Sequence, residues 1–244
     1  MKEELLSKTV AAVVTEDYRA ADVFKKYGID FCCGGKVSIK ETCRKKNIDP
    51  AVLIDELSVI GNAVDPEHDF AAWEADRLTH YIVDKHHRYV SSNLDLIRQY
   101  ADKVAIVHGV HHPEVKEIAV LFAKVADELA THMRKEEVVL FPYIEQLCEI
   151  KRKNLYAENP PFGTIENPIR NMEQEHDLAG DIMHRISELS DQYNPPSDAC
   201  NTYRVLYAKL KEFEDDLHMH VHLENNILFP KALDLERERT ASLD

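Results

Sequence analysis

The chain has 244 residues and a formal net charge of −14, from 44 acidic and 30 basic side chains. Such a charge disfavours nucleic acids and anionic membranes as partners, because both bind basic surfaces. Few glycines and frequent Glu, Lys, Leu and Ala favour an all-α fold. No apolar run is long enough to span a bilayer, the first residues lack a signal peptide's apolar segment, and 5 cysteines do not suggest a disulfide framework. We therefore expect a cytoplasmic protein.

Residues 1–62 are expected to form a small helical domain. Apolar periodicity predicts a helix over residues 15–27 that ends at a glycine. A serine and a glutamate with capping-box spacing predict a second helix that starts at Ser38. An Asp-Pro pair predicts the start of a third helix at Asp49. Polar residues and a proline over residues 62–69 indicate a linker.

Residues 70–236 are expected to form four longer helices. In the first, Leu78, Ile82 and His86 recur every four residues, so the histidine should lie on the apolar face. The other three are predicted over residues 113–149, 167–193 and 198–235, with proline-containing breaks between them.

The second and fourth of these helices share the motif His-x-x-x-Glu-x-x-x-Leu-Phe-Pro, which starts at His132 and again at His220. Residues four apart on a helix lie on one face, about 5–6 Å apart at Cβ. His132 with Glu136, and His220 with Glu224, can therefore each offer a nitrogen and a carboxylate to one point. Two copies of this pair predict a site for two metal ions.

Another histidine precedes each copy on its own apolar-periodic segment. His86 lies 46 residues before His132, and His176 lies 44 residues before His220. Two antiparallel helices of about 25 residues and a turn span such an interval. Each half is therefore expected to be a helical hairpin, and the two hairpins should pair into a four-helix bundle with the metal site between facing helices.

A lone histidine on an apolar face is more often a hydrogen-bonded core residue than a ligand. Two unpaired carboxylates inside a bundle would, however, be strongly destabilising, and metal coordination removes that cost. Four imidazoles and two carboxylates suit iron, manganese or zinc, and two carboxylates able to bridge favour two iron ions. The predicted ligands are His86, His132, Glu136, His176, His220 and Glu224. Most other histidines are interpreted as surface residues, with His184 as a candidate hydrogen-bond partner of a ligand.

Residues 71–235 resemble the haemerythrin-like bundle, and these motifs, with Glu175-His176-Asp177, closely resemble the iron–sulfur cluster repair di-iron proteins, the RIC family. Residues 29–35 resemble that family's small N-terminal domain, which carries the adjacent cysteines. The resemblance implies an up-down four-helix bundle with two non-haem iron ions, bridged by an oxo group when oxidised. It also implies a cytoplasmic bacterial protein that helps to repair iron–sulfur clusters damaged by nitric oxide or oxidants. Damaged iron–sulfur proteins would then be partners, nitric oxide or oxygen small ligands, and a homodimer one option for assembly.

Three functions stay open on the sequence alone. The protein could repair clusters by donating iron or processing nitric oxide, it could be a nitric oxide reductase enzyme, or it could be an oxygen or iron sensor or carrier. The Cys-Cys domain argues against a plain carrier, which needs no thiols. Oxygen-carrying haemerythrins are expected to place a further histidine four residues after the third-helix ligand, but this chain has Gly180, which would leave coordination positions open. A close helix contact is the alternative reason for this glycine.

Cys32 and Cys33 are predicted to act as a thiol pair, because adjacent Cα atoms lie about 3.8 Å apart, below the usual disulfide range. The glycines that follow allow backbone N–H groups to converge, and the helix start at Ser38 adds a positive dipole end, so thiolate character is expected. The hypothesis is a redox or relay role at the di-iron site, within one chain or across a dimer. The alternative is two buried apolar side chains. The three other cysteines are interpreted as structural.

Overall fold

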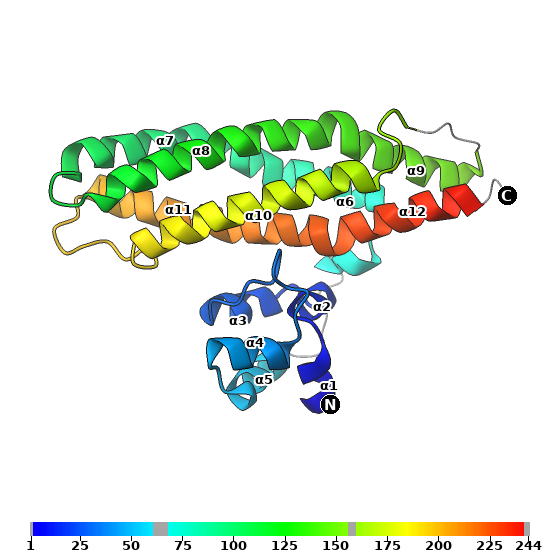
Figure 1. The fold of residues 1–244 in the computed structure, drawn as a ribbon, viewed down its shortest axis with the longest axis horizontal. Coiled ribbons are helices and arrows are strands. Elements are labelled where there is room, and N and C mark those ends of the chain that lie inside the picture. Colours follow the sequence, from blue (N-terminus) through cyan, green and yellow to red (C-terminus); the bar gives the residue numbers. More distant parts are fainter. Residues whose placement is uncertain (1, 61–67, 156–159, 242–244) are drawn as a thin grey trace.

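A computed structural model describes residues 2–60, 68–155 and 160–241. These residues form helices and one isolated bridge between Thr9 and Ser38, which confirms the all-α class. Figure 1 shows a long helical bundle with a small N-terminal domain on one side of it. Within the described ranges, no helix is both long and apolar enough to cross a membrane.

The N-terminal domain contains α1 (Lys2–Ser7), α2 (Val10–Glu16), α3 (Ala20–Lys26), α4 (Ile39–Lys46) and α5 (Pro50–Val59). The single helix predicted over residues 15–27 is wrong. Asp17 ends α2, and its carboxylate accepts hydrogen bonds from the guanidinium of Arg19, so the chain turns before α3 begins. The predicted starts of α4 and α5 are confirmed, because Ser38 and Asp49 accept hydrogen bonds from first-turn N–H groups at 3.2 and 2.9 Å. Most of the predicted linker lies outside the described residues.

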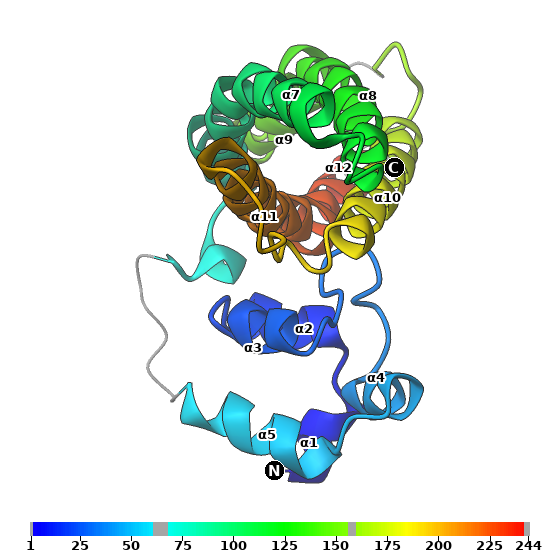
Figure 2. The same ribbon diagram turned by 90° about the vertical axis from the view of Figure 1, so that its left-hand side faces the viewer.

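The bundle consists of four helical rods, which Figure 2 shows nearly end-on around one core. A 3-10 turn, η2 (Phe70–Ala72), precedes the first rod. The first rod is α6 (Ala75–Ile82), η3 (Val83–His87) and α7 (Arg88–His108), and the second is α8 (Glu114–Lys135), η4 (Glu136–Leu140) and α9 (Phe141–Lys153). The third rod is α10 (Glu166–Leu189), and the fourth is α11 (Asn201–Leu223), η5 (Glu224–Leu228) and α12 (Phe229–Ala241). The three η segments inside the rods are π-helical turns.

The π-turn η3 changes which residues of the first rod face the core. A π-turn takes up about one residue more than an α-turn, so the inward face moves by one position. The series that begins at Leu78 and Ile82 therefore continues at His87, and then at Val90 and Leu94, all of which are buried. A strict α-helical period does not include this shift, so it places His86 on the inward face instead of His87.

Two apolar clusters fill the bundle. One lies toward the α7–α8 turn and extends into the N-terminal domain, where it includes Val10, Val14 and Phe31. The other lies toward α9 and α12 and includes Leu78 and Phe229. Along each rod, the buried histidines and the motif glutamates Glu136 and Glu224 lie where the residues of one cluster give way to those of the other. The bundle core thus has a polar layer between two apolar ends.

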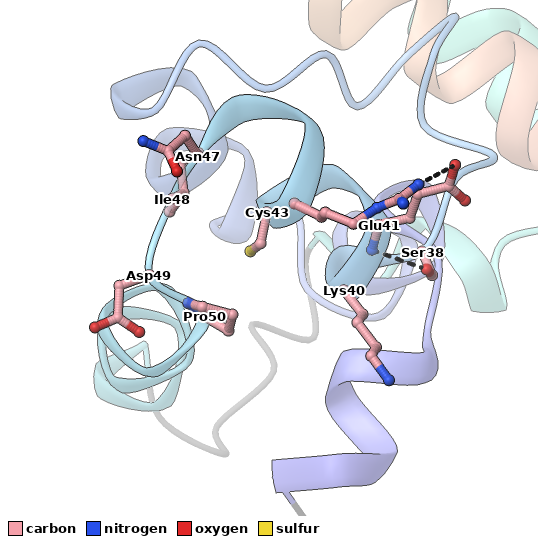
Figure 3. Close-up of a pocket in the computed structure, with 9 residues that line it drawn as sticks. Ser38, Lys40, Glu41, Cys43, Asn47, Ile48, Asp49 and Pro50 are labelled. Atoms are coloured by element: carbon pink, nitrogen blue, oxygen red, sulfur yellow. Dashed lines mark hydrogen bonds and ion pairs between the residues drawn. The ribbon is translucent and has the colours of Figure 1, made fainter.

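An open groove of about 980 Å³ lies on the small domain between α4 and α5 (Figure 3). Lys40 and Arg44 line it together with the almost fully buried Cys43. Burial raises the pKa of the Cys43 thiol, so this cysteine is not a ready nucleophile. The groove shares no residue with the polar layer of the bundle.

Candidate metal centre

Six side chains from the four rods meet in the polar layer. Each is at most 2% exposed. They are His87, His132, Glu136, His176, His220 and Glu224. Their donor atoms form two groups of four, and within each group all atoms lie within 4.8 Å of one another.

The structure brings together five of the six predicted ligands but not His86. His87, interpreted from the sequence as a surface residue, takes the predicted place because the π-turn moves the inward face by one position. The Nδ1 atom of His86 lies 3.0 Å from Asp216 Oδ1 instead. Its ring stacks on that of His220, with centroids 5.5 Å apart. His86 is therefore a neighbour of the cluster and not a member of it.

The two groups share both carboxylates. We call them the His87 position (His87, His220, Glu136, Glu224) and the His176 position (His132, His176, Glu136, Glu224). Glu224 faces both positions, because Oε1 is 3.0 Å from His220 Nε2 and Oε2 is 3.1 Å from His176 Nε2. Glu136 does the same through Oε2, which lies 3.4 and 3.3 Å from the Nε2 atoms of the other two histidines. Each position thus has two nitrogen and two oxygen donors.

Three of the four imidazoles are oriented by hydrogen bonds from Nδ1. The pairs are His87 with Glu137 at 2.8 Å, His132 with Glu175 at 2.9 Å, and His176 with Asn225 at 2.8 Å. A proton held at Nδ1 leaves the lone pair of a neutral imidazole on Nε2, directed into the cluster. Across each position two Nε2 atoms lie only 3.2 and 3.0 Å apart. Two lone pairs at that separation need a proton or a cation between them.

The charges of the cluster fit a cation. Both oxygens of Glu136 and Oε2 of Glu224 are buried without a hydrogen-bond donor. Burial and mutual repulsion disfavour the charged carboxylates, yet the surrounding histidines hold the pKa of both below the usual value. Burial opposes a charge on His87 and His132, but the two glutamates raise their pKa values to about 10 and about 9. Two negative charges are therefore fixed in the cluster, and metal ions can replace the protons that balance them.

Sequence reasoning missed two of the orienting residues. Glu137 and Asn225 each follow a motif glutamate directly, so the repeat itself carried the signal. The predicted orienting residue, His184, is exposed and pairs with Glu188 at 3.5 Å. His222, interpreted as a surface residue, is buried against the ring of Phe31.

Gly180 lies one turn after His176 on α10. A Cβ added there would meet no atom within 4 Å. A close helix contact is therefore not the reason for this glycine.

The cysteine loop is organised by Asp30. Its carboxylate accepts hydrogen bonds from the backbone N–H groups of Cys32, Cys33 and Gly34 at 2.8, 3.2 and 2.7 Å, and from the Cys32 thiol at 3.1 Å. The N–H groups thus converge on Asp30 and not on a thiol. A hydrogen bond with Cys33, burial and the charge of Asp30 raise the pKa of Cys32 well above its usual value. The expected thiolate character is therefore not found at Cys32.

The same loop lies against the π-turn η5 of the fourth rod. Asn226 Nδ2 donates to the carbonyl oxygen of Cys32 at 3.0 Å, and Asn225 Nδ2 donates a longer hydrogen bond to Cys33 Sγ at 4.0 Å. Asn225 is also the residue that orients His176. The loop therefore reaches a ligand-orienting residue within one chain.

The fold and the buried cluster define a cation-binding bundle protein of the haemerythrin type with an appended thiol-bearing domain. Residues 78–232 match the hemerythrin HHE cation binding domain, and residues 6–60 match a domain of unknown function, DUF542. The iron-sulfur cluster repair protein ScdA of Staphylococcus haemolyticus (strain JCSC1435) is 34% identical over 222 residues, which cover 91% of this chain and 96% of that protein. Iron-sulfur cluster repair proteins YtfE of Musicola paradisiaca (strain Ech703) and Yersinia pestis are 36% and 33% identical, over 88% and 93% of this chain and 91% and 97% of theirs. The chain belongs to this family of iron–sulfur cluster repair proteins.

Proposed function

We propose that the protein binds one iron ion at the His87 position and one at the His176 position, and that it repairs iron–sulfur clusters damaged by nitric oxide or oxidants in the cytoplasm. One observation carries the proposal: Glu136 and Glu224 each face both positions. Carboxylates shared in this way, with two imidazoles on each side, are a donor set suited to a pair of iron ions. The names of the relatives support the repair role.

The chain's own residues hold and shield the two positions. Glu137, Glu175 and Asn225 fix three imidazole rings by hydrogen bonds, and such partners strengthen a ligand and set its direction. Bound ferrous iron would supply an exchangeable metal and electrons. With only four protein donors at each position, a bound ion would have room for further ligands, and the lack of a side-chain donor at Gly180 is consistent with such an open side.

The proposed role of Cys32 and Cys33 is to relay electrons or a ligand to the cluster. Support comes from the contact of Cys33 with Asn225 and from the hydrogen bond that Asn226 donates to the carbonyl oxygen of Cys32. Cys33 is half-buried, whereas Cys32 is buried and its thiol donates a hydrogen bond to Asp30, so Cys33 is the more accessible of the two. We therefore propose that Cys33, and not Cys32, is the thiol that reacts with molecules from solution.

The metal assignment is tested with Glu136→Ala and Glu224→Ala. Each variant should hold fewer than two irons per chain and have an altered visible spectrum, because each glutamate faces both positions. His184→Ala, at an exposed histidine of the same bundle, is the control and should keep both irons. If both glutamate variants keep two irons and the wild-type spectrum, the proposed donor set is wrong.

Iron donation and nitric oxide turnover predict different products. Anaerobic titration of the reduced protein with nitric oxide should be followed for released iron and for nitrous oxide in one sample. Iron release without nitrous oxide supports donation, and nitrous oxide with retained iron supports a reductase. If neither released iron nor nitrous oxide is detected, a sensor or carrier is favoured and the proposed repair mechanism is contradicted.

A further inference from the structure

Asn225 lies between the thiol loop and the metal centre. Asn225 is 7% exposed, so the residue is largely shielded from bulk water. Oδ1 accepts a hydrogen bond from His176 Nδ1 at 2.8 Å, and Nδ2 donates toward Cys33 Sγ at 4.0 Å. The amide is planar, so a movement at one end changes the hydrogen bond at the other.

The other half of the bundle has no equivalent link among the contacts of the described residues. Glu137 occupies the repeat position that matches Asn225 and orients His87 at 2.8 Å. Its side chain, however, is 44% exposed, and its described partner is that histidine alone. The first copy of the motif continues with Val138, which is exposed, where the second has Asn226, which grips the cysteine loop. The two halves thus offer similar donors but only one is connected to the thiols.

We propose that Asn225 is a positioning residue that couples the Cys33 thiol to His176, so that only the ion at the His176 position responds to the state of the thiol loop. The inference rests on the proposed function, because it requires ions at both positions. It goes further by making the two ions inequivalent and by naming the one that the small domain controls.

The physical basis is the orientation of a ligand. The hydrogen bond from Nδ1 fixes the ring of His176, and loss of such a partner lowers metal affinity about 10- to 100-fold. Modification of Cys33, or its engagement by another group, would remove the acceptor of Asn225 Nδ2 and let the amide turn away from His176. Coupling of binding free energies is reciprocal. Metal loading should therefore also change the reactivity of Cys33.

Iron release tests the first half of the inference. The anaerobic ferrous protein is mixed with a chromogenic iron chelator, and the release of each of the two ions is followed. In Asn225→Ala one ion per chain should leave about 10- to 100-fold faster while the other is unchanged. Glu137→Ala, the matched variant in the other half, should accelerate the other ion. Equal acceleration of both ions in Asn225→Ala, or of neither, would overturn the proposal.

A second variant separates coupling from simple support of His176. Asn225→Asp keeps an acceptor for His176 Nδ1 but loses the Nδ2 donor toward Cys33. Cys33→Ser should change the release of one ion in the wild-type background and have no effect in the Asn225→Asp background. Additive effects of the two substitutions would mean that the residues act independently, and the coupling would then be refuted.

Thiol modification gives a readout without metal release. The rate at which iodoacetamide alkylates Cys33 is measured by peptide mass spectrometry in iron-free and iron-loaded protein. Loading should change this rate in the wild type and in Glu137→Gln, but not in Asn225→Asp. The same change in all three proteins would overturn the proposal. Failure of the proposed function has a different signature, namely that the wild type binds no iron at the cluster.

Discussion

If the proposed pair of iron ions is correct, replacing His87 with alanine should remove about one of the two ions. His87 is one of four protein donors at the His87 position, and the His176 position does not use it. Loss of a residue that only orients a ligand already lowers metal affinity about 10- to 100-fold, so loss of the ligand itself should exceed this. Iron per chain, measured after gel filtration, should fall from about two to about one, with the iron at the His176 position retained.

His86→Ala is the matched control, because the two histidines are adjacent and both are buried. His86 contributes no donor to either position, so this variant should keep both ions. It does lose a hydrogen bond and leaves Asp216 without that partner, which should lower the free energy of unfolding by about 1–3 kcal/mol in urea titrations. If His86→Ala loses an ion and His87→Ala keeps both, the register assigned to η3 is wrong.

Three further predictions concern single features of the molecule. Gly180→Ala should raise the free energy of unfolding by about 1 kcal/mol, because alanine is the better helix former and its methyl group meets no atom within 4 Å; a loss in urea titrations would contradict this. Burial raises the pKa of Glu214 from 4.5 to about 7, so its contribution to stability is complete below pH 4.5 and is lost as the pH rises through about 7. Between pH 5 and 8 the free energy of unfolding of the wild type should fall by about 2 kcal/mol relative to that of Glu214→Gln, with allowance for solvent screening. Parallel pH profiles for the two proteins would refute the raised pKa of Glu214. Cys32→Ser combined with Cys33→Ser should keep the wild-type iron content, since no donor changes, while cluster repair or nitric oxide consumption falls sharply; a wild-type repair rate would make the thiols structural.

The repeated motif was enough to predict four of the six side chains that meet in the polar layer. His132, Glu136, His220 and Glu224 lie four residues apart within α-helical segments or at their ends, where an α-helical period holds. His87 could not be predicted in the same way, since it is the last residue of a π-turn and nothing in the local sequence marks that turn. Where two adjacent histidines lie near an apolar face, the helix geometry decides which of them faces the core.

The thiol loop shows a second limit of sequence reasoning. The glycines correctly indicated a tight backbone, since a Cβ at Gly35 would lie 2.4 Å from the carbonyl oxygen of Phe31. The direction of backbone N–H groups depends on their acceptor. Here the acceptor is the carboxylate of Asp30, two residues before Cys32, and not a cysteine thiolate. Likewise, the long-range contacts with Asn225 and Asn226 link residues more than 190 positions apart, which no local pattern can predict.

The polar layer between the two apolar clusters bears on how the bundle unfolds. Each apolar cluster packs its own end of the bundle, but the layer between them buries two carboxylates, whose desolvation and proximity oppose their charged forms unless cations or protons balance them. Metal ions that bind donors from all four rods would join the two ends into one cooperative unit. We therefore expect one calorimetric transition for the iron-loaded protein and two, or one much broader transition, for the iron-free protein; equally sharp single transitions in both would show that the apolar clusters are coupled without metal. If the protein donates its iron to a damaged iron–sulfur protein, its own polar layer would lose this link between the two ends. The iron-free protein should then be more readily unfolded and degraded than the iron-loaded one.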